Sequence, residues 1–156
     1  MGMTFALFLA CGCGRESAVD DAIREVSQRQ NIFSDYPQPG KTYLSYSTFH
    51  GYQVNYLSAN DAWLWYPGNA IGVREKWRAD KNKLCWRTLQ ITYNPASGKR
   101  SNAWQCESLS IAQKTVVSEL KGDPFGLSSG SIPFVLDRCK PPEKFLVDAR
   151  SDCFGS

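Results

Sequence analysis

The sequence has one histidine, His50, and lacks several motifs that mark enzyme classes. There is no phosphate-binding Walker loop, no H-E-x-x-H zinc motif and no dinucleotide fingerprint. His50 is a candidate general base, with Asp61 or Asp80 to orient it, but a histidine beside a glycine turn is more often a surface or packing residue. We therefore expect a protein that is not an enzyme and that uses no cofactor.

Long apolar stretches are also missing. The run Met3–Ala10 is too short to span a bilayer and is similar to the end of a signal peptide. Leu9-Ala10-Cys11 resembles a bacterial lipobox, although Phe8 stands where leucine is usual and no Lys or Arg precedes the run. We expect export to the periplasm, with lipidation at Cys11. The alternative is an ordinary apolar N-terminus with two free thiols.

The sequence lacks a strong excess of either charge, because 18 Lys and Arg residues nearly balance 15 Asp and Glu residues, for a net charge of +3. Nucleic-acid-binding domains concentrate far more positive charge on one face, so we expect no nucleic-acid partner.

The cysteine spacing that zinc sites require is missing as well, because the only close pair among six cysteines is Cys11 and Cys13, far from His50. Six cysteines without a zinc pattern favour disulfides and an oxidising compartment.

The stretch from Asp61 to Cys106 holds all five tryptophans, and its aromatic and β-branched residues alternate with charged ones between turn signals. This pattern is typical of consecutive antiparallel strands. We predict a mainly β protein, a small antiparallel β-barrel or curved sheet stabilised by disulfides. Its predicted segments are a signal-like segment (1–13), a helix and Pro-rich linker (14–40), the barrel (41–139) and a tail (140–156). Within the barrel we expect a closing strand at 132–136 and a helix at 111–121, where the adjacent Val116 and Val117 leave a strand as the alternative.

The clearest strand, Ile71–Arg78, has two different faces. Ile71, Val73 and Trp77 point one way, and the basic residues Arg74, Lys76 and Arg78 point the other. The basic row is a candidate docking surface for phosphate-bearing lipid or an acidic protein, which Arg87, Lys99 and Arg100 would extend. The alternative is an exposed face that charge keeps soluble.

Trp63 and Trp65 share one face of the preceding strand. They would either line a ligand cavity inside the barrel or simply fill its interior.

Within the segment Ser110–Gln113, the spacing of serine and glutamine fits a capping box at the start of the predicted short helix.

Two cysteine pairs are expected to form disulfides. Leu84–Thr92 and Asn102–Leu109 would form a hairpin that brings Cys85 opposite Cys106. A disulfide between them would stabilise the folded state by about 3 kcal/mol, because it constrains the unfolded chain. Cys139 and Cys153 would join the tail to itself, unless one of them pairs with an N-terminal cysteine.

The segment from Gly72 to Trp77, followed by Leu84-Cys85, Tyr93-Asn94-Pro95 and Cys106, resembles a pattern in small exported proteins of alphaproteobacteria. The resemblance covers about residues 61 to 139. It implies a lipocalin-like small β-barrel and a periplasmic location. The function of that family is unknown, so the resemblance assigns no catalytic or binding residue.

These features favour a non-enzymatic periplasmic accessory subunit, or binding module, that docks on a membrane-associated protein complex, with a lipid anchor as a further link. One alternative is a carrier of a small apolar ligand inside the barrel. Another is an inhibitor of a secreted hydrolase such as lysozyme, acting through the loop Asn94–Asn102.

Overall fold

The computed structural model describes residues 14–89, 92–94, 99–151 and 153, with the backbone alone described for 14–17, 92–94 and 99–101. The predicted signal segment and lipidation at Cys11 lie outside the described residues. The elements are α1 Gly14–Ser27, β1 Lys41–Ser47, β2 Gly51–Leu57, β3 Asp61–Trp65, β4 Val73–Asp80, β5 Lys83–Thr88, β6 Thr92–Asn94, β7 Lys99–Ser101, β8 Gln105–Ser108, α2 Leu109–Thr115, β9 Val116–Lys121, and the 3-10 turns η1 Leu127–Ser129 and η2 Glu143–Phe145.

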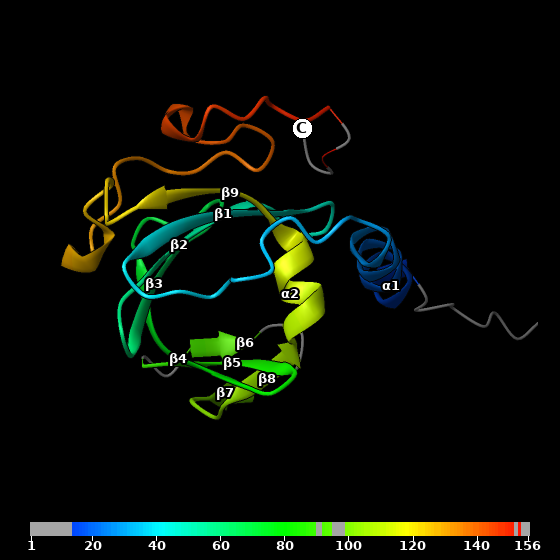
Figure 1. The fold of residues 1–156 in the computed structure, drawn as a ribbon, viewed down its shortest axis with the longest axis horizontal. Helices are drawn as coiled ribbons and strands as arrows, with labels where there is room; N and C mark the ends of the chain where they lie inside the picture. Colours follow the sequence, from blue (N-terminus) through cyan, green and yellow to red (C-terminus); the bar gives the residue numbers. More distant parts are fainter. Residues whose placement is uncertain (1–13, 90–91, 95–98, 152, 154–156) are drawn as a thin grey trace, which may run out of the picture.

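The centre of the protein is one seven-stranded antiparallel sheet in the order β8-β5-β4-β3-β2-β1-β9. The sheet curls into a half-barrel, and α2 connects the edge strand β8 to the opposite edge strand β9 (Figure 1). The short strands β6 and β7 pair separately. The predicted mainly β, curved-sheet architecture is confirmed.

The concave side of the sheet has its own apolar core. Tyr43, Leu57 and Leu84 are buried there, and α2 adds Ala112. Residues 31–40, which the sequence marked as a linker, cross the open side of the half-barrel (Figure 1). The ring of Tyr36 in this segment is buried in the concave core. The half-barrel is therefore closed by a helix and a loop instead of by further strands.

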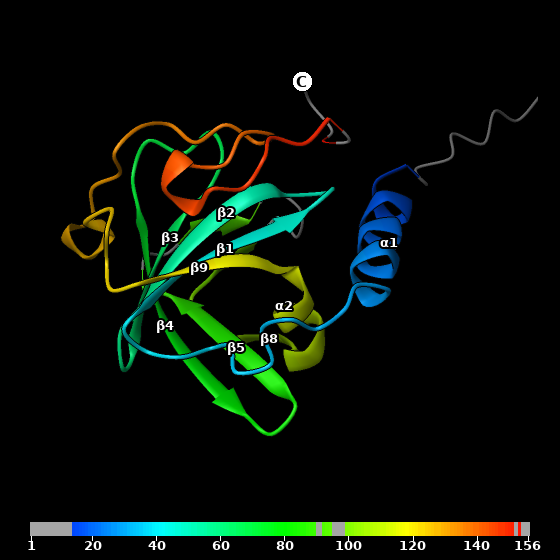
Figure 2. The same cartoon turned by 45° about the horizontal axis from the view of Figure 1, so that its top comes forward.

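The outer side of the sheet carries a second core beneath the C-terminal tail. Trp65 is fully buried there, and its indole Nε1 donates a hydrogen bond to the carbonyl of Phe134 at 3.0 Å. Figure 2 shows the tail lying over β1 and β2. Residues 132–136 form this covering loop and not the predicted closing strand. Trp63 and Trp65 thus lie outside the half-barrel, and their predicted place in its interior is wrong.

The predicted helix at 111–121 is two elements. Helix α2 ends at Thr115, and β9 begins at Val116, because adjacent β-branched residues suit a strand and β1 offers an open edge for pairing. The expected capping box does not form, since the helix starts earlier, with Ser108 at its N-cap. The Gln113 side chain instead donates to the carbonyls of Ser34 and Tyr36, which fastens the crossing loop to α2.

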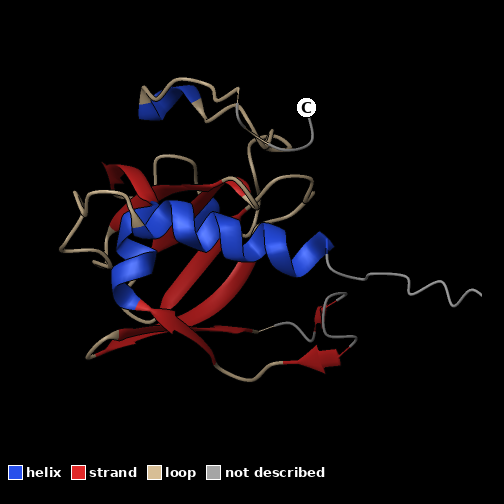
Figure 3. Cartoon of the chain, turned by 90° about the vertical axis from the view of Figure 1, so that its right-hand side faces the viewer, coloured by secondary structure: helices blue, strands red, loops and turns tan. Residues whose placement is uncertain are grey.

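Helix α1 packs beside α2 at one end of the half-barrel, where Figure 3 shows both helices in front of the strands. Ala22 and Val26 are its buried residues. Arg29 follows the helix and donates from Nη1 to the carbonyl of Tyr46 at 2.8 Å, and Lys114 donates from Nζ to the carbonyl of Ser27 at 2.6 Å. No helix in the described part of the chain is long and apolar enough to cross a membrane.

Both predicted disulfides are present. Cys85 and Cys106 face each other in the β5–β8 register with their Cα atoms 4.0 Å apart, which joins edge strand β8 to the sheet. Cys139 and Cys153 are also bonded and close the tail on itself. Both pairings follow the sequence-based expectation.

Candidate functional site

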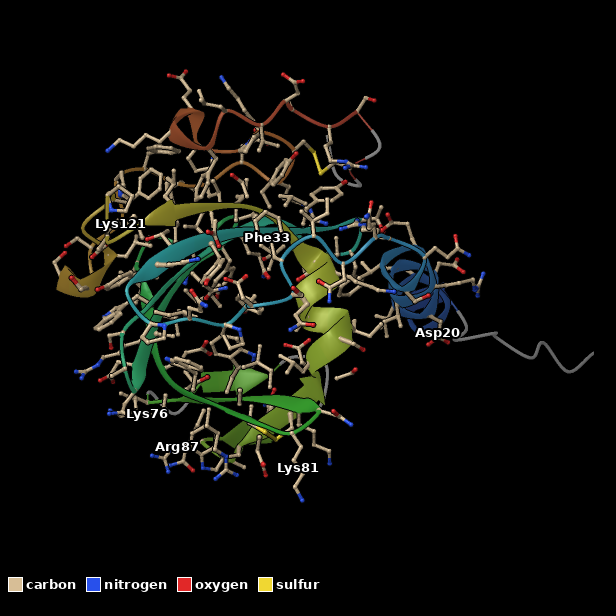
Figure 4. The ribbon with its side chains drawn as sticks, viewed as in Figure 1. Asp20, Phe33, Lys76, Lys81, Arg87 and Lys121 are labelled. Carbon is tan, nitrogen blue, oxygen red and sulfur yellow. A yellow bond between two sulfur atoms is a disulfide. The ribbon has the colours of Figure 1, made fainter. Side chains whose placement is uncertain are left out.

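The outer face of β3 to β5, which we call the outer basic face, concentrates the positive charge of the protein. In Figure 4 the labelled residues Lys76, Lys81 and Arg87 point away from the half-barrel. Basic residues on this face exceed acidic ones by four, whereas the net charge of the whole chain is only +3. The outer basic face comprises Arg74, Lys76, Arg78, Lys81, Lys83 and Arg87, with Asp61 and Asp80 as its acidic members.

Part of this face is neutralised within the protein. The Asp61 carboxylate accepts a salt bridge from Lys76 Nζ at 2.8 Å and another from Arg74 Nη2 at 3.2 Å. The hydrogen bond from Lys76 lowers the pKa of the Asp61 carboxyl, and Arg74 lowers it further. Two of the three basic residues singled out from the sequence are therefore paired.

The third, Arg78, belongs to an aromatic cluster. Its guanidinium carbon lies 4.4 Å from the centroid of the Trp104 ring, and that of Arg87 lies 5.0 Å from the same centroid. Neither arginine forms an ion pair with a carboxylate within the described residues. The predicted extension through Lys99 and Arg100 is described only as backbone, in β7.

His50 lies apart from the carboxylates expected to orient it. Its side chain lines the concave side of the sheet, whereas Asp61 binds Lys76 on the outer side. Asp80 closes β4 at the end of the sheet opposite the β1–β2 turn that carries His50. Partial desolvation, with the charge of Arg138, lowers the pKa of His50, which is an exposed residue. The catalytic arrangement considered from the sequence is therefore not assembled.

A polar cavity of about 360 Å³ lies on the concave side of the half-barrel. Among the described residues, its lining contains two carboxyl groups and no lysine or arginine. The lining residues come from the crossing loop, the sheet and α2: Tyr36, Ser45, Tyr46, Ser47, His50, Gln53, Asn55, Leu64, Glu75, Trp86, Gln105, Glu107, Ala112 and Thr115.

Each carboxyl group of the cavity accepts one hydrogen bond from a described side chain. Thr88 Oγ1 donates to Glu75 Oε1 at 3.2 Å, and Trp86 Nε1 donates to Glu107 Oε1 at 3.1 Å. Desolvation raises the pKa of the Glu75 carboxyl and that of the Glu107 carboxyl, although Glu107 is an exposed residue of the edge strand β8. Burial raises the pKa of the Tyr36 phenol, and the nearby charges of Glu107 and Glu75 add to that effect.

Sequence reasoning passed over this cavity, although β4 contained a signal. Glu75 occupies an inward position between Val73 and Trp77, where the strand pattern otherwise places apolar side chains. A carboxylate at such a position is costly to bury without a partner, which marks it as a candidate site residue. The crossing loop and Glu107 carried no comparable signal.

A G-x-S-x-G match in the sequence, Gly126 to Gly130, is a structural turn. In nucleophile elbows this motif joins a strand to a helix. Here it forms the 3-10 turn η1, held by Asp123, whose carboxylate accepts the backbone N–H groups of Leu127 and Ser128 at 2.8 Å. Leu127 anchors the turn in the outer core, on the face opposite the cavity that His50 lines.

An apolar cavity of about 750 Å³ lies outside the half-barrel, between Phe125, Phe134 and the prolines of the tail. No group of three or more His, Cys, Asp or Glu side chains among the described residues is placed to hold a metal ion.

No family model, curated protein or solved structure matches this chain. The function is therefore inferred from the chain's own residues.

Proposed function

We propose that this protein is a non-enzymatic binding module, a periplasmic accessory subunit that docks on an acidic protein surface of a membrane-associated complex. The observation that carries the proposal is the outer basic face, where the excess of positive charge is larger than the net charge of the chain. Charge of one sign gathered on one face steers association with a partner of opposite charge.

The cluster of Arg78, Arg87 and Trp104 supplies the centre of the docking surface. Tryptophan and arginine dominate the energetics of protein interfaces, and their truncation at such centres costs about 2 kcal/mol or more. Both guanidinium groups lie over the Trp104 ring, and carboxylates of a partner would accept hydrogen bonds from their N–H groups. The Cys85–Cys106 bond joins β5, which carries Arg87, to β8, which begins directly after Trp104.

The compartment assignment rests on the cysteines. One disulfide joins the edge strand β8 to β5, and the other closes the tail on itself. Disulfides are typical of proteins that mature in an oxidising environment such as the periplasm. An anchor at Cys11 would hold the protein at the membrane, where the proposed partner complex resides. These points support the same proposal as the outer basic face.

The test is a pull-down of the tagged protein from detergent-solubilised membranes, with bound proteins identified by mass spectrometry. We expect a stoichiometric partner that is lost from the double variant Arg78→Glu, Arg87→Glu and weakened by salt. The control variant Lys121→Glu, Lys140→Glu makes the same change in charge at β9 and in the tail, and should keep the partner. Equal loss from both variants, or a free monomer from the native protein, would refute docking through this face.

A second candidate function, carriage of a small apolar ligand, is favoured by the cavity beside the tail. The rings of Phe125 and Phe134 and the side chain of Val135 line it, and Phe134 is 52% exposed. This moves the expected ligand site from the half-barrel interior to its outer side. Binding of a fatty acid that Phe134→Ser abolishes would establish it, and absence of binding by the native protein would remove it.

A further inference from the structure

The polar cavity is a second site, independent of the outer basic face. We propose that it binds a small organic cation, a primary amine or diamine, between the carboxylates of Glu75 and Glu107. Both residues line the cavity, and neither forms a salt bridge with a basic side chain within the described part of the chain. The cavity therefore has negative groups without a protein countercharge, and an ammonium group supplies one.

The hydrogen-bonding balance of the lining points to the same ligand. Carboxylates accept hydrogen bonds only, and each of these two accepts one hydrogen bond from the described side chains, which leaves further acceptor capacity. The amide oxygen of Asn55 is buried and has no hydrogen-bond partner among the described residues. An unpaired buried acceptor costs about 1–3 kcal/mol, which a ligand donor would recover. An ammonium carries three donors and no acceptor, and so matches this set.

Aromatic walls strengthen the match to a cation. Trp86 and Tyr36 both line the cavity, and aromatic faces attract cations within about 6 Å of the ring centroid. The Trp86 indole also donates to Oε1 of Glu107 and orients that carboxylate. The lining thus combines charge, acceptors and aromatic surface, which together recognise alkylammonium groups.

Size and composition narrow the ligand class. The volume of about 360 Å³ lies at the lower end of the range for small-ligand sites, roughly 300–1,000 Å³. No third acidic, histidine or cysteine ligand joins the two carboxyls among the described residues, which argues against a dedicated metal site. A short alkyl amine is small enough for this volume and needs no third metal-type ligand.

The experiment is isothermal titration calorimetry of the full chain with four-carbon probes that differ in charge. We expect 1,4-diaminobutane to bind at least tenfold more tightly than 1,4-butanediol, and succinate not to bind. The indole N–H resonance of Trp86 should shift during the same titration, which locates the ligand in the cavity. Equal binding of diaminobutane and butanediol, or an equal response to calcium chloride, would overturn the assignment.

Charge-neutral variants complete the test. Glu75→Gln with Glu107→Gln should weaken diaminobutane binding at least tenfold, whereas Glu143→Gln, an exposed carboxylate outside the cavity, should leave it unchanged. Glutamine has nearly the same shape as glutamate and needs no charge desolvation, so we expect the variants to fold. If thermal unfolding shows that the double variant is not folded, diaminobutane binding is measured with Glu107→Gln alone, because Glu107 lies on the exposed strand β8. Unchanged binding by this single variant would refute the proposal.

Discussion

Removal of the Cys85–Cys106 disulfide tests how the fold supports both sites. The bond closes a chain separation of 21 residues, and the loss of unfolded-state constraint predicts a decrease of about 3 kcal/mol in the free energy of unfolding for the double alanine variant. For a domain of this size the decrease corresponds to roughly 6–12 °C in melting temperature. Because β5 is the only neighbour of β8 in the sheet, we also expect β8 to loosen locally.

The assay is urea unfolding followed by tryptophan fluorescence, combined with amide hydrogen exchange. Exchange should accelerate at Gln105 to Ser108, the residues of β8, in the variant that lacks the bond. The control is the double alanine variant of Cys139 and Cys153, whose separation of 14 residues predicts a similar decrease of about 3 kcal/mol but leaves β8 protected. A decrease below about 1 kcal/mol without the Cys85–Cys106 bond would refute the entropic argument. Equal exchange in the two variants would refute the local one.

Three further substitutions test the two cores and the cavity. Trp65→Phe removes the donor to the Phe134 carbonyl and leaves a gap in the outer core, so urea titration should show a loss of about 2 kcal/mol, and a neutral result would contradict the described packing. Gly51→Ala places a Cβ 2.5 Å from the carbonyl oxygen of Arg138 at a positive φ of 74°, so its melting temperature should fall further than that of Gly68→Ala, which has a similar φ of 76° but brings its Cβ within 4 Å of no described atom; equal decreases would contradict the clash. Because burial raises the pKa of Glu75, the native protein should match Glu75→Gln in stability below the ordinary value of 4.5 and become less stable than the variant as pH rises through the raised pKa; parallel stability curves would contradict this.

Strand alternation and turn signals were sufficient to predict the curved antiparallel sheet except for its edge strand β9, which was expected to be helical. The pattern of β4 placed Arg74, Lys76 and Arg78 on one face, and the hairpin geometry placed Cys85 opposite Cys106, as the structure shows. These features depend on neighbours along the chain or across one pair of strands. Local periodicity carries that information.

Features that depend on segments without periodicity could not be predicted. Alternation separates the two faces of β3 but does not say which is concave, so Trp65 was assigned to the interior although the irregular tail covers it outside. Tyr36 lies in a loop whose prolines and glycine resemble a spacer, yet its ring enters the concave core. The cavity depends on this loop and on Glu107, which is distant in sequence from Glu75.

Site-specific photocrosslinking in intact cells tests the docking proposal most directly. A photoreactive amino acid would replace Lys83, an exposed residue of the outer basic face, or Lys121, an exposed residue of β9 at the other edge of the sheet. We expect one discrete crosslinked membrane-complex protein from position 83 and none from position 121. Crosslinking from position 121 alone, or the same products from both positions, would contradict docking through the outer basic face.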